Sequence, residues 1–184
     1  MKEMKRILFL GSLSLLTISC SNKLSESKVE KLVNECLEKN PTYGQGIIRT
    51  GKISYMSDED VKIYQELAKK GLLTIENKEV KDGWYTSKFQ MVTLTDKSKS
   101  YVIETKDNYG DSKSNYVKLY TNKLDKVGSI QEIPSMNVAE VTVTFKKDAK
   151  TPFYDLLEKD KTDFNTRKIG IKKTENNGWV YCEK

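Results

Sequence analysis

The sequence predicts an α+β fold: an N-terminal helix, a winged-helix-like α/β segment, and then a mainly antiparallel β half with one short helix. Two patterns favour this class. Apolar residues recur at helical spacing in residues 27–39 and 61–70, whereas they alternate with polar residues in residues 138–145. Near the end, Asn177-Gly178 lies between two strand-like runs and is a strong signal for a two-residue hairpin turn.

The N-terminus has the pattern of a secretory signal peptide. A basic segment, MKEMKR, precedes an apolar run over residues 7–16, which is too short to span a bilayer because a spanning helix needs about 20 apolar residues. The following TISC motif, which ends at Cys20, resembles the lipobox of bacterial lipoproteins, although that family usually has Leu or Val at the position of Thr17. The resemblance covers residues 1–22 and implies acylation of Cys20. The alternative is an ordinary signal peptide that leaves Cys20 as a thiol.

The lipoprotein resemblance also implies a location. Lipid chains on Cys20 supply a membrane anchor. Ser21, directly after the lipidated position, is compatible by resemblance with delivery to the outer membrane. We therefore expect a lipid-anchored protein of the cell envelope, on the outer membrane and facing the periplasm.

Polar composition divides the rest of the chain. Residues 106–115, KDNYGDSKSN, contain no apolar run and are predicted to link two halves. The expected organisation is a signal peptide (residues 1–19), a lipidated tether (20–26), a helical and wing-like half (27–105), a linker (106–115) and an antiparallel β half (116–184).

Two cysteines remain once Cys20 is acylated. Cys36 lies on the apolar stripe of the helix predicted over residues 27–39, and Cys182 is the third residue from the end. An exported protein is in a compartment that permits disulfides, and a Cys36–Cys182 bond would close nearly the whole domain. The alternative is two buried thiols.

The order of elements in residues 57–103 resembles the tail of a winged-helix domain. A helix ending at Gly71 is followed by two strands around Lys81-Asp82-Gly83 and by a short helix capped at Thr95. The resemblance implies a shape. It implies no contact with nucleic acid, because the first helix opens with three carboxylates, which repel phosphate.

The β half is predicted from alternation and turn signals. Thr151-Pro152 resembles the start of a short helix, FYDLLEK. The closing hairpin, ENNGWVYCEK, is loosely similar to that of cystatin-like or NTF2-like α+β cones. The expected strands cover residues 116–121, 127–133, 138–145, 168–173 and 179–182.

The chain lacks the residues that most catalytic mechanisms require. The chain contains no histidine, which excludes a Ser-His-Asp triad, a Cys-His pair and any His-ligated metal site. It also contains no CxxC, GxxxxGK[ST], GxGxxG or GxSxG motif. We therefore expect no enzyme, no cofactor and no metal.

Carboxylate pairs are the remaining route to catalysis, since glycoside hydrolysis needs only two of them. Two acidic clusters are present. For both, a structural role at a helix start or in a solvated turn is the simpler interpretation. Their members are Asp58, Glu59 and Asp60 in the first, and Asp155, Glu158, Asp160 and Asp163 in the second.

Aromatic residues near turns are the candidate ligand contacts. Trp84 and Tyr85 follow Asp82-Gly83, and an aromatic side chain combines a large contact area with a polar handle. Tyr109 and Tyr116 flank the predicted linker, and Trp179 is expected in the core. The function predicted is a non-enzymatic envelope lipoprotein that binds a protein, a glycan or another envelope component. The alternatives are a hydrolase that uses carboxylates alone, and a winged-helix regulator.

Overall fold

The structure is a computed structural model that describes residues 23–182, and it confirms the α+β class. An N-terminal helix precedes an eight-stranded antiparallel sheet with short helices. The elements are α1 (Glu26–Lys39), β1 (Tyr43–Ile53), α2 (Asp58–Lys69), β2 (Leu73–Asp82), β3 (Tyr85–Leu94), α3 (Asp96–Lys99), β4 (Val102–Asp107), β5 (Ser112–Ile133), the 3-10 helix η1 (Pro134–Met136), β6 (Val138–Asp148), α4 (Tyr154–Leu157), β7 (Phe164–Thr174) and β8 (Gly178–Val180).

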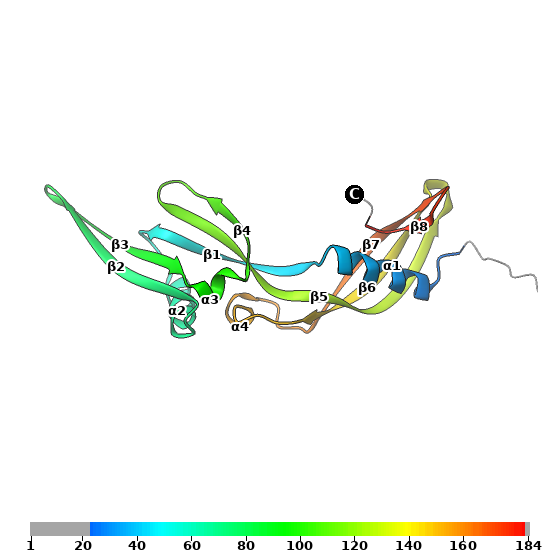
Figure 1. Cartoon of the computed structure of the whole chain (residues 1–184), viewed down its shortest axis with the longest axis horizontal. Helices are drawn as coiled ribbons and strands as arrows, with labels where there is room; N and C mark the ends of the chain where they lie inside the picture. The colour runs from blue at the N-terminus through cyan, green and yellow to red at the C-terminus, as the bar shows by residue number, and fades with distance from the viewer. Residues whose placement is uncertain (1–22, 183–184) are drawn as a thin grey trace, which may run out of the picture.

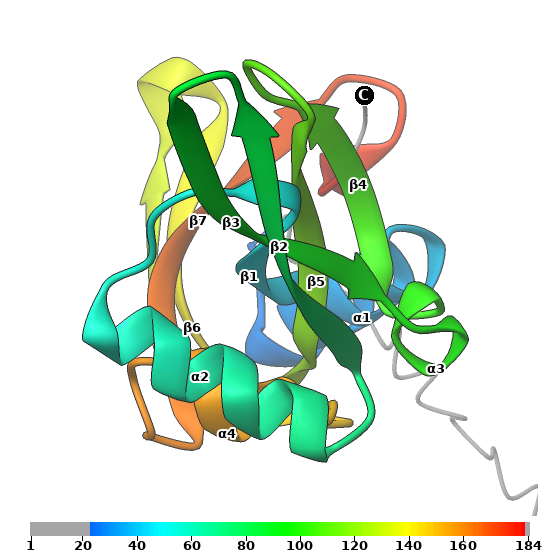
Figure 2. The same cartoon turned by 90° about the vertical axis from the view of Figure 1, so that its left-hand side faces the viewer.

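The molecule is elongated, and its two ends differ (Figure 1). The helix α1 and the strands β6, β7 and β8 occupy one end, while the β2–β3 hairpin projects from the other. The end-on view shows β2 and β3 in front, β4 at one side and α2 across the bottom (Figure 2). The first described residues and the hairpin therefore lie at opposite ends of the long axis.

Strand β5 connects the two ends. It has 22 residues, about 70 Å of extended chain at about 3.3 Å per residue, where the sequence predicts two separate strands. One part pairs with both β1 and β4, and the following part pairs with β6. Register shifts between Leu124 and Lys126 and between Val127 and Ile130 interrupt the alternation of side chains. Because these bulges interrupt the alternation, the sequence pattern predicts two strands where the structure has one.

The buried apolar residues form two clusters. One joins α2, β2 and β3 to β1 and α4 through residues such as Ile48, Leu67 and Phe153. The other joins α1 to β6, β7 and β8 through residues such as Val29 and Phe145. Helix α1, which the sequence places in the first half, thus packs against the C-terminal strands. Its apolar stripe predicts burial but carries no information about which strands it covers.

The predicted linker, residues 106–115, is part of the sheet. It contains the last residues of β4, the first residues of β5 and the turn between them, where Gly110 has a positive φ of 73°. The carbonyl of Asp111 accepts a hydrogen bond from the backbone N–H of Lys52 (3.0 Å), so the turn is held against β1. The segment has no apolar run because it forms a hairpin turn at the surface.

Local signals explain the helix ends. Ser57 accepts a hydrogen bond from the N–H of Asp60 (3.1 Å) and caps α2, and Gly71, with φ of 68°, follows its C-terminus. Helix α1 begins at Glu26 with Ser25 as its cap, one residue before the predicted start. The closing hairpin has a three-residue loop between the pair Thr174 and Gly178, instead of the two-residue turn predicted. Between residues 23 and 182, none of the helices has the length and apolar character needed to cross a membrane.

Candidate functional site

The β2–β3 hairpin ends in an exposed aromatic turn. Asp82 and Tyr85 form the last strand pair, so Gly83 and Trp84 are the two turn residues. Gly83 has a φ of 57°, whereas Trp84 does not have a positive φ, and this is the arrangement of a type II′ turn. Glycine is favoured at that position because it has no Cβ to clash. The turn thereby projects Trp84 at the tip of a hairpin whose two strands have ten residues each.

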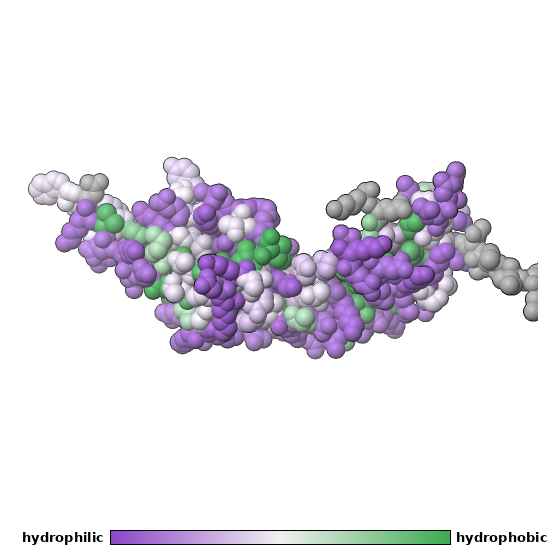
Figure 3. Space-filling view, in the orientation of Figure 1, coloured by the Kyte–Doolittle hydropathy of each residue, from purple (hydrophilic) through white to green (hydrophobic). Residues whose placement is uncertain are grey.

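The two tryptophans lie in opposite environments. Trp84 is fully exposed (107%), whereas Trp179 is 4% exposed within the cluster of α1 and the C-terminal strands. Tyr85, beside Trp84, is also exposed, as is Val80 on the same hairpin. In the space-filling view, pale atoms of intermediate hydropathy mark this end of an otherwise largely hydrophilic face (Figure 3). The structure places both predicted contact residues, Trp84 and Tyr85, at the tip farthest from α1.

A cleft lies beside the middle of this hairpin, between its strands, the loop after β1 and the start of α2. Its volume is about 550 Å³, within the range of small-molecule sites. A smaller hollow of about 210 Å³ adjoins it and shares Val61, Asn77 and Gln90 with it. The lining residues of the cleft are Ile53, Ser54, Tyr55, Met56, Val61, Asn77, Lys78, Glu79, Lys88, Phe89 and Gln90.

Asn77 and Gln90 form a cross-strand pair of side-chain amides. They are register partners in β2 and β3, and the Nε2 of Gln90 donates to the Oδ1 of Asn77 (3.3 Å). This bond uses one donor of Gln90 and one acceptor site of Asn77. The pair therefore keeps donors on Asn77 and an acceptor on Gln90 for a ligand.

A second groove, of about 410 Å³, lies between β3 and β4. One of its polar lining groups, the side-chain amide of Asn115, already forms hydrogen bonds within the protein. The amide of Asn115 donates to the carbonyl of Ile48 (3.2 Å) and to Thr50 (2.9 Å), and its oxygen accepts from Thr105 (2.9 Å). Apolar side chains, such as Met91 and Val102, line much of the remainder.

The other predicted aromatics belong to the β4–β5 hairpin. Tyr109 is fully exposed in its turn (102%). Tyr116 is half-buried, with the Lys106 ammonium 4.7 Å from its ring centroid. Neither residue is part of the β2–β3 hairpin or lines its cleft, so Tyr109 offers a matched control for Trp84.

The first acidic cluster lies in the first turn of α2. Asp58, Glu59 and Asp60 are placed where carboxylates interact favourably with the helix dipole. Asp60 also forms an ion pair with Arg49 on β1 (3.6 Å). These contacts give the cluster a structural role at the helix start.

The second acidic cluster surrounds the loop after α4, where lysines hold it. Hydrogen bonds from the backbone N–H and the hydroxyl of Thr162 keep the pKa of Asp160 below its ordinary value. A hydrogen bond from Lys150 (2.7 Å) lowers the pKa of Asp163 in the same way. A general acid in glycoside hydrolysis needs the opposite shift, a raised pKa.

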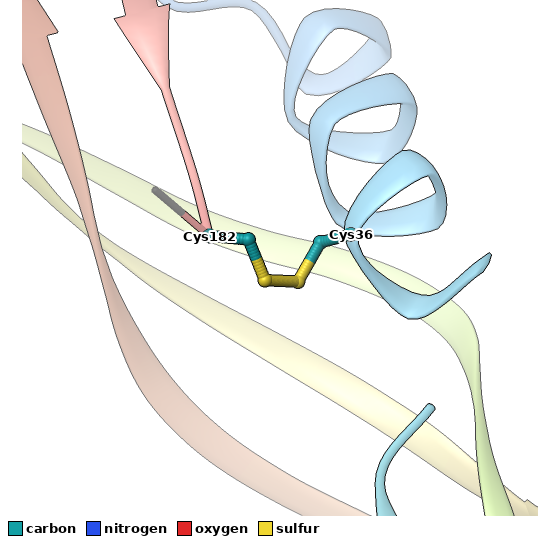
Figure 4. Close-up of a disulfide and its surroundings, with 2 residues drawn as sticks. All are labelled: Cys36 and Cys182. Carbon is teal, nitrogen blue, oxygen red and sulfur yellow. A yellow bond between two sulfur atoms is a disulfide. The ribbon is translucent and has the colours of Figure 1, made fainter. Parts of the chain in front are cut away.

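Cys36 on α1 and Cys182 after β8 are joined by a disulfide, with their Cα atoms 5.6 Å apart (Figure 4). The bond links the first helix to the last strand, which already share one apolar cluster. Cys20, the predicted lipidation site, lies outside the described residues. Within residues 23–182, no group of three or more Cys, Asp and Glu side chains is placed to hold a metal ion.

Sequence reasoning missed the cleft. Tyr55, Asn77 and Gln90 carry no motif, and they come together only because β2 pairs with β3 and both pack over the start of α2. The helix, strand, strand and short helix that resemble a winged-helix tail are present, but β3 pairs with β1 and so continues into the larger sheet.

Comparison with known proteins gives no significant match to a protein-family model, a curated protein or a solved structure.

Proposed function

We propose that this protein is a non-enzymatic lipoprotein of the bacterial cell envelope, anchored through Cys20, whose β2–β3 hairpin binds an envelope partner. The observation that carries the binding role is the full exposure of Trp84 at the tip of the hairpin. Tryptophan and tyrosine are enriched among the residues that dominate binding energy at interfaces. An exposed Trp84-Tyr85 pair at a projecting turn matches that chemistry.

The shape of the molecule supports the same proposal. The predicted tether ends where α1 begins, at Glu26, and α1 lies at the opposite end of the long axis from the hairpin (Figure 1). A lipid on Cys20 would hold the α1 end near the membrane. The hairpin tip would then face away from that membrane, toward other components of the envelope.

Intact mass spectrometry of protein purified from native membranes tests the anchor. The proposal predicts a chain that begins at an acylated Cys20 and gains two mass units on reduction, because the Cys36–Cys182 bond opens. An unprocessed chain without acyl groups would contradict the anchor and return the winged-helix interpretation, with nucleic acid as partner, to consideration.

Retention on envelope fragments tests the binding role. We expect full-length protein in detergent to sediment with washed envelope fragments, and the Trp84→Ala substitution to lower the retained fraction at least tenfold. Tyr109→Ala removes an equally exposed aromatic side chain from the neighbouring hairpin and should leave retention unchanged. Equal retention of the two variants would contradict a role for the β2–β3 tip.

A further inference from the structure

We infer that the cleft between α2 and the β2–β3 hairpin is a binding site for a neutral oligosaccharide. The inference rests on the proposed function, in that the same hairpin carries the binding surface, and it names a ligand class for it. Three features of the cleft support it: its amide pair, the exposed ring of Tyr55 and its paired charges.

The amide pair suits a sugar hydroxyl pattern. Asn77 and Gln90 are mutually hydrogen-bonded, which fixes the orientation of both amides and leaves donors beside an acceptor. Adjacent hydroxyl groups on a sugar ring present the same combination, because each hydroxyl both donates and accepts. A third amide, Gln65, lines the adjoining hollow with Asn77 and Gln90. The cleft and the adjoining hollow therefore offer three neutral amides that donate and accept, beside the charged lining residues Lys78, Glu79 and Lys88.

The apolar lining of the cleft includes two aromatic residues, Tyr55 and Phe89, besides Ile53, Met56 and Val61. Tyr55 is 79% exposed in the loop after β1, whereas Phe89, the register partner of Lys78, lies on the face of the hairpin opposite to Asn77 and Gln90. The Lys52 ammonium lies 4.7 Å from the Phe89 ring centroid and contributes a cation–π contact that helps to hold the ring. The exposed ring of Tyr55, in a cleft that also holds hydrogen-bonding amides, offers the flat apolar surface that the C–H face of a sugar requires.

The charges around the cleft are paired, which favours a neutral ligand. Lys78 forms an ion pair with Glu76 (3.1 Å), and Lys88 pairs with Glu79 (4.0 Å). An acidic peptide or an anionic lipid would have to compete with these carboxylates for the lysines. The uncharged groups of the lining include the amides of Asn77 and Gln90 and the exposed ring of Tyr55, and a neutral oligosaccharide engages both kinds of group.

Titration calorimetry with sugars of known structure tests the inference. Full-length protein in detergent is titrated with three neutral sugars, cellotetraose, maltotetraose and tetra-N-acetylchitotetraose, each at concentrations up to about 1 mM, so that weak binding is also detected. We expect at least one of them to bind. Absence of binding by all three would overturn the inference.

Four variants locate the site. Gln90→Leu removes half of the amide pair and Tyr55→Ala removes the stacking surface, and each should weaken sugar binding at least tenfold. Tyr55→Phe keeps the ring and should retain affinity within about threefold, while Tyr109→Ala should have no effect. Circular dichroism and thermal unfolding of each variant show whether the fold is kept. Sugar binding that persists in folded Gln90→Leu and Tyr55→Ala would contradict this site.

The oligosaccharide site and the binding role of the hairpin tip can be excluded independently of each other. If no sugar binds but Trp84→Ala still lowers retention on envelope fragments, the oligosaccharide site is excluded and the hairpin keeps a different partner. If neither binding is seen, both proposals are excluded.

Discussion

The hydroxyl of Tyr64 makes two hydrogen bonds to the backbone of one residue, Arg49. It accepts from the Arg49 N–H (2.7 Å) and donates to the Arg49 carbonyl (3.1 Å). Strand β1 pairs with β3 only through residues 51–53, so at Arg49 this edge of the strand faces α2 instead of another strand. Tyr64 thus occupies the place of a neighbouring strand and fixes α2 against the sheet. The cleft depends on this contact, because α2 forms one of its walls.

Removal of this hydroxyl should destabilise the fold. The Tyr64→Phe substitution leaves the N–H and carbonyl of Arg49 without their partner in a half-buried position, at a cost of about 1–3 kcal/mol. Urea unfolding should therefore show a lower free energy of unfolding. Tyr109→Phe, at an exposed position, is the control and should change this free energy by less than about 0.5 kcal/mol. Equal stability of the two variants would show that Tyr64 does not support β1.

The same hydroxyl predicts a pH dependence. Burial raises the pKa of Tyr64 above its ordinary value, because the charged phenolate is poorly solvated there. The folded state therefore keeps a proton that the unfolded chain loses above pH of about 10, so this stabilising contribution is complete below that pH and is lost as the pH rises further.

Comparison of the wild type with Tyr64→Phe isolates this contribution. The pKa of Tyr120 is also raised by burial, but Tyr120 is present in both proteins and contributes equally to them. The free energy of unfolding should fall more steeply with pH in the wild type than in Tyr64→Phe. The difference in this free energy between the two proteins should therefore become smaller above pH of about 10. Parallel curves would contradict the prediction.

Lys147 holds the loop after α4 against the sheet. Its side chain is only 2% exposed, and its ammonium lies 3.7 Å from Glu158, 3.5 Å from the Asp160 carboxylate and 2.5 Å from the Asp160 carbonyl. Lys147→Ala leaves Glu158, 14% exposed, without its cation and should cost about 3–5 kcal/mol.

An exposed ion pair in the same loop provides the control for Lys147. Lys150→Ala breaks the pair with Asp163, where both side chains are more than one-third exposed, and should cost about 1 kcal/mol or less. Guanidinium unfolding of both variants gives the comparison. A Lys147→Ala cost no larger than that of Lys150→Ala would contradict a structural role for the buried ammonium.

Gly44 makes room for an aromatic ring. A Cβ added there would lie 2.1 Å from the Tyr120 ring, which packs edge-on against Tyr154 with centroids 5.9 Å apart. Gly44→Ala should therefore shift β1 away from β5 and destabilise the protein by about 1–3 kcal/mol. At Gly170, in β7, a Cβ would meet nothing within 4 Å, so Gly170→Ala should be neutral or slightly stabilising in thermal unfolding. The reverse order would contradict this packing.

Local signals predicted much of the fold. Ser57 and Gly71 mark the ends of α2 by capping chemistry, and the alternation in residues 138–145 predicts β6. Each of these signals acts within a few residues of the chain, so a sequence displays them directly. The exposed position of Trp84 also follows from a local signal, the glycine turn before it.

The packing of distant segments against one another could not be predicted from such local signals. The packing of α1 against β6–β8 and the continuity of β5 through its bulges depend on contacts between distant segments. The cleft is a further example, since Tyr55 approaches Asn77 and Gln90 only through the packing of the loop, helix and hairpin. Residues without a motif are recognised as a site only after the chain has brought them together.

Site-specific photo-cross-linking in intact cells tests whether the tip of the β2–β3 hairpin contacts an envelope partner. A photoreactive amino acid with an aromatic side chain, which keeps an aromatic ring at each tip, replaces Trp84 in one variant of the full-length chain and Tyr109 in another, both of them fully exposed turn residues. The account predicts a discrete cross-linked product from position 84 and none from position 109. It also predicts that Cys20→Ser, which removes the anchor, abolishes that product. Cross-linking from both positions alike, or from neither, would contradict the proposal that the β2–β3 hairpin of an anchored protein binds an envelope partner.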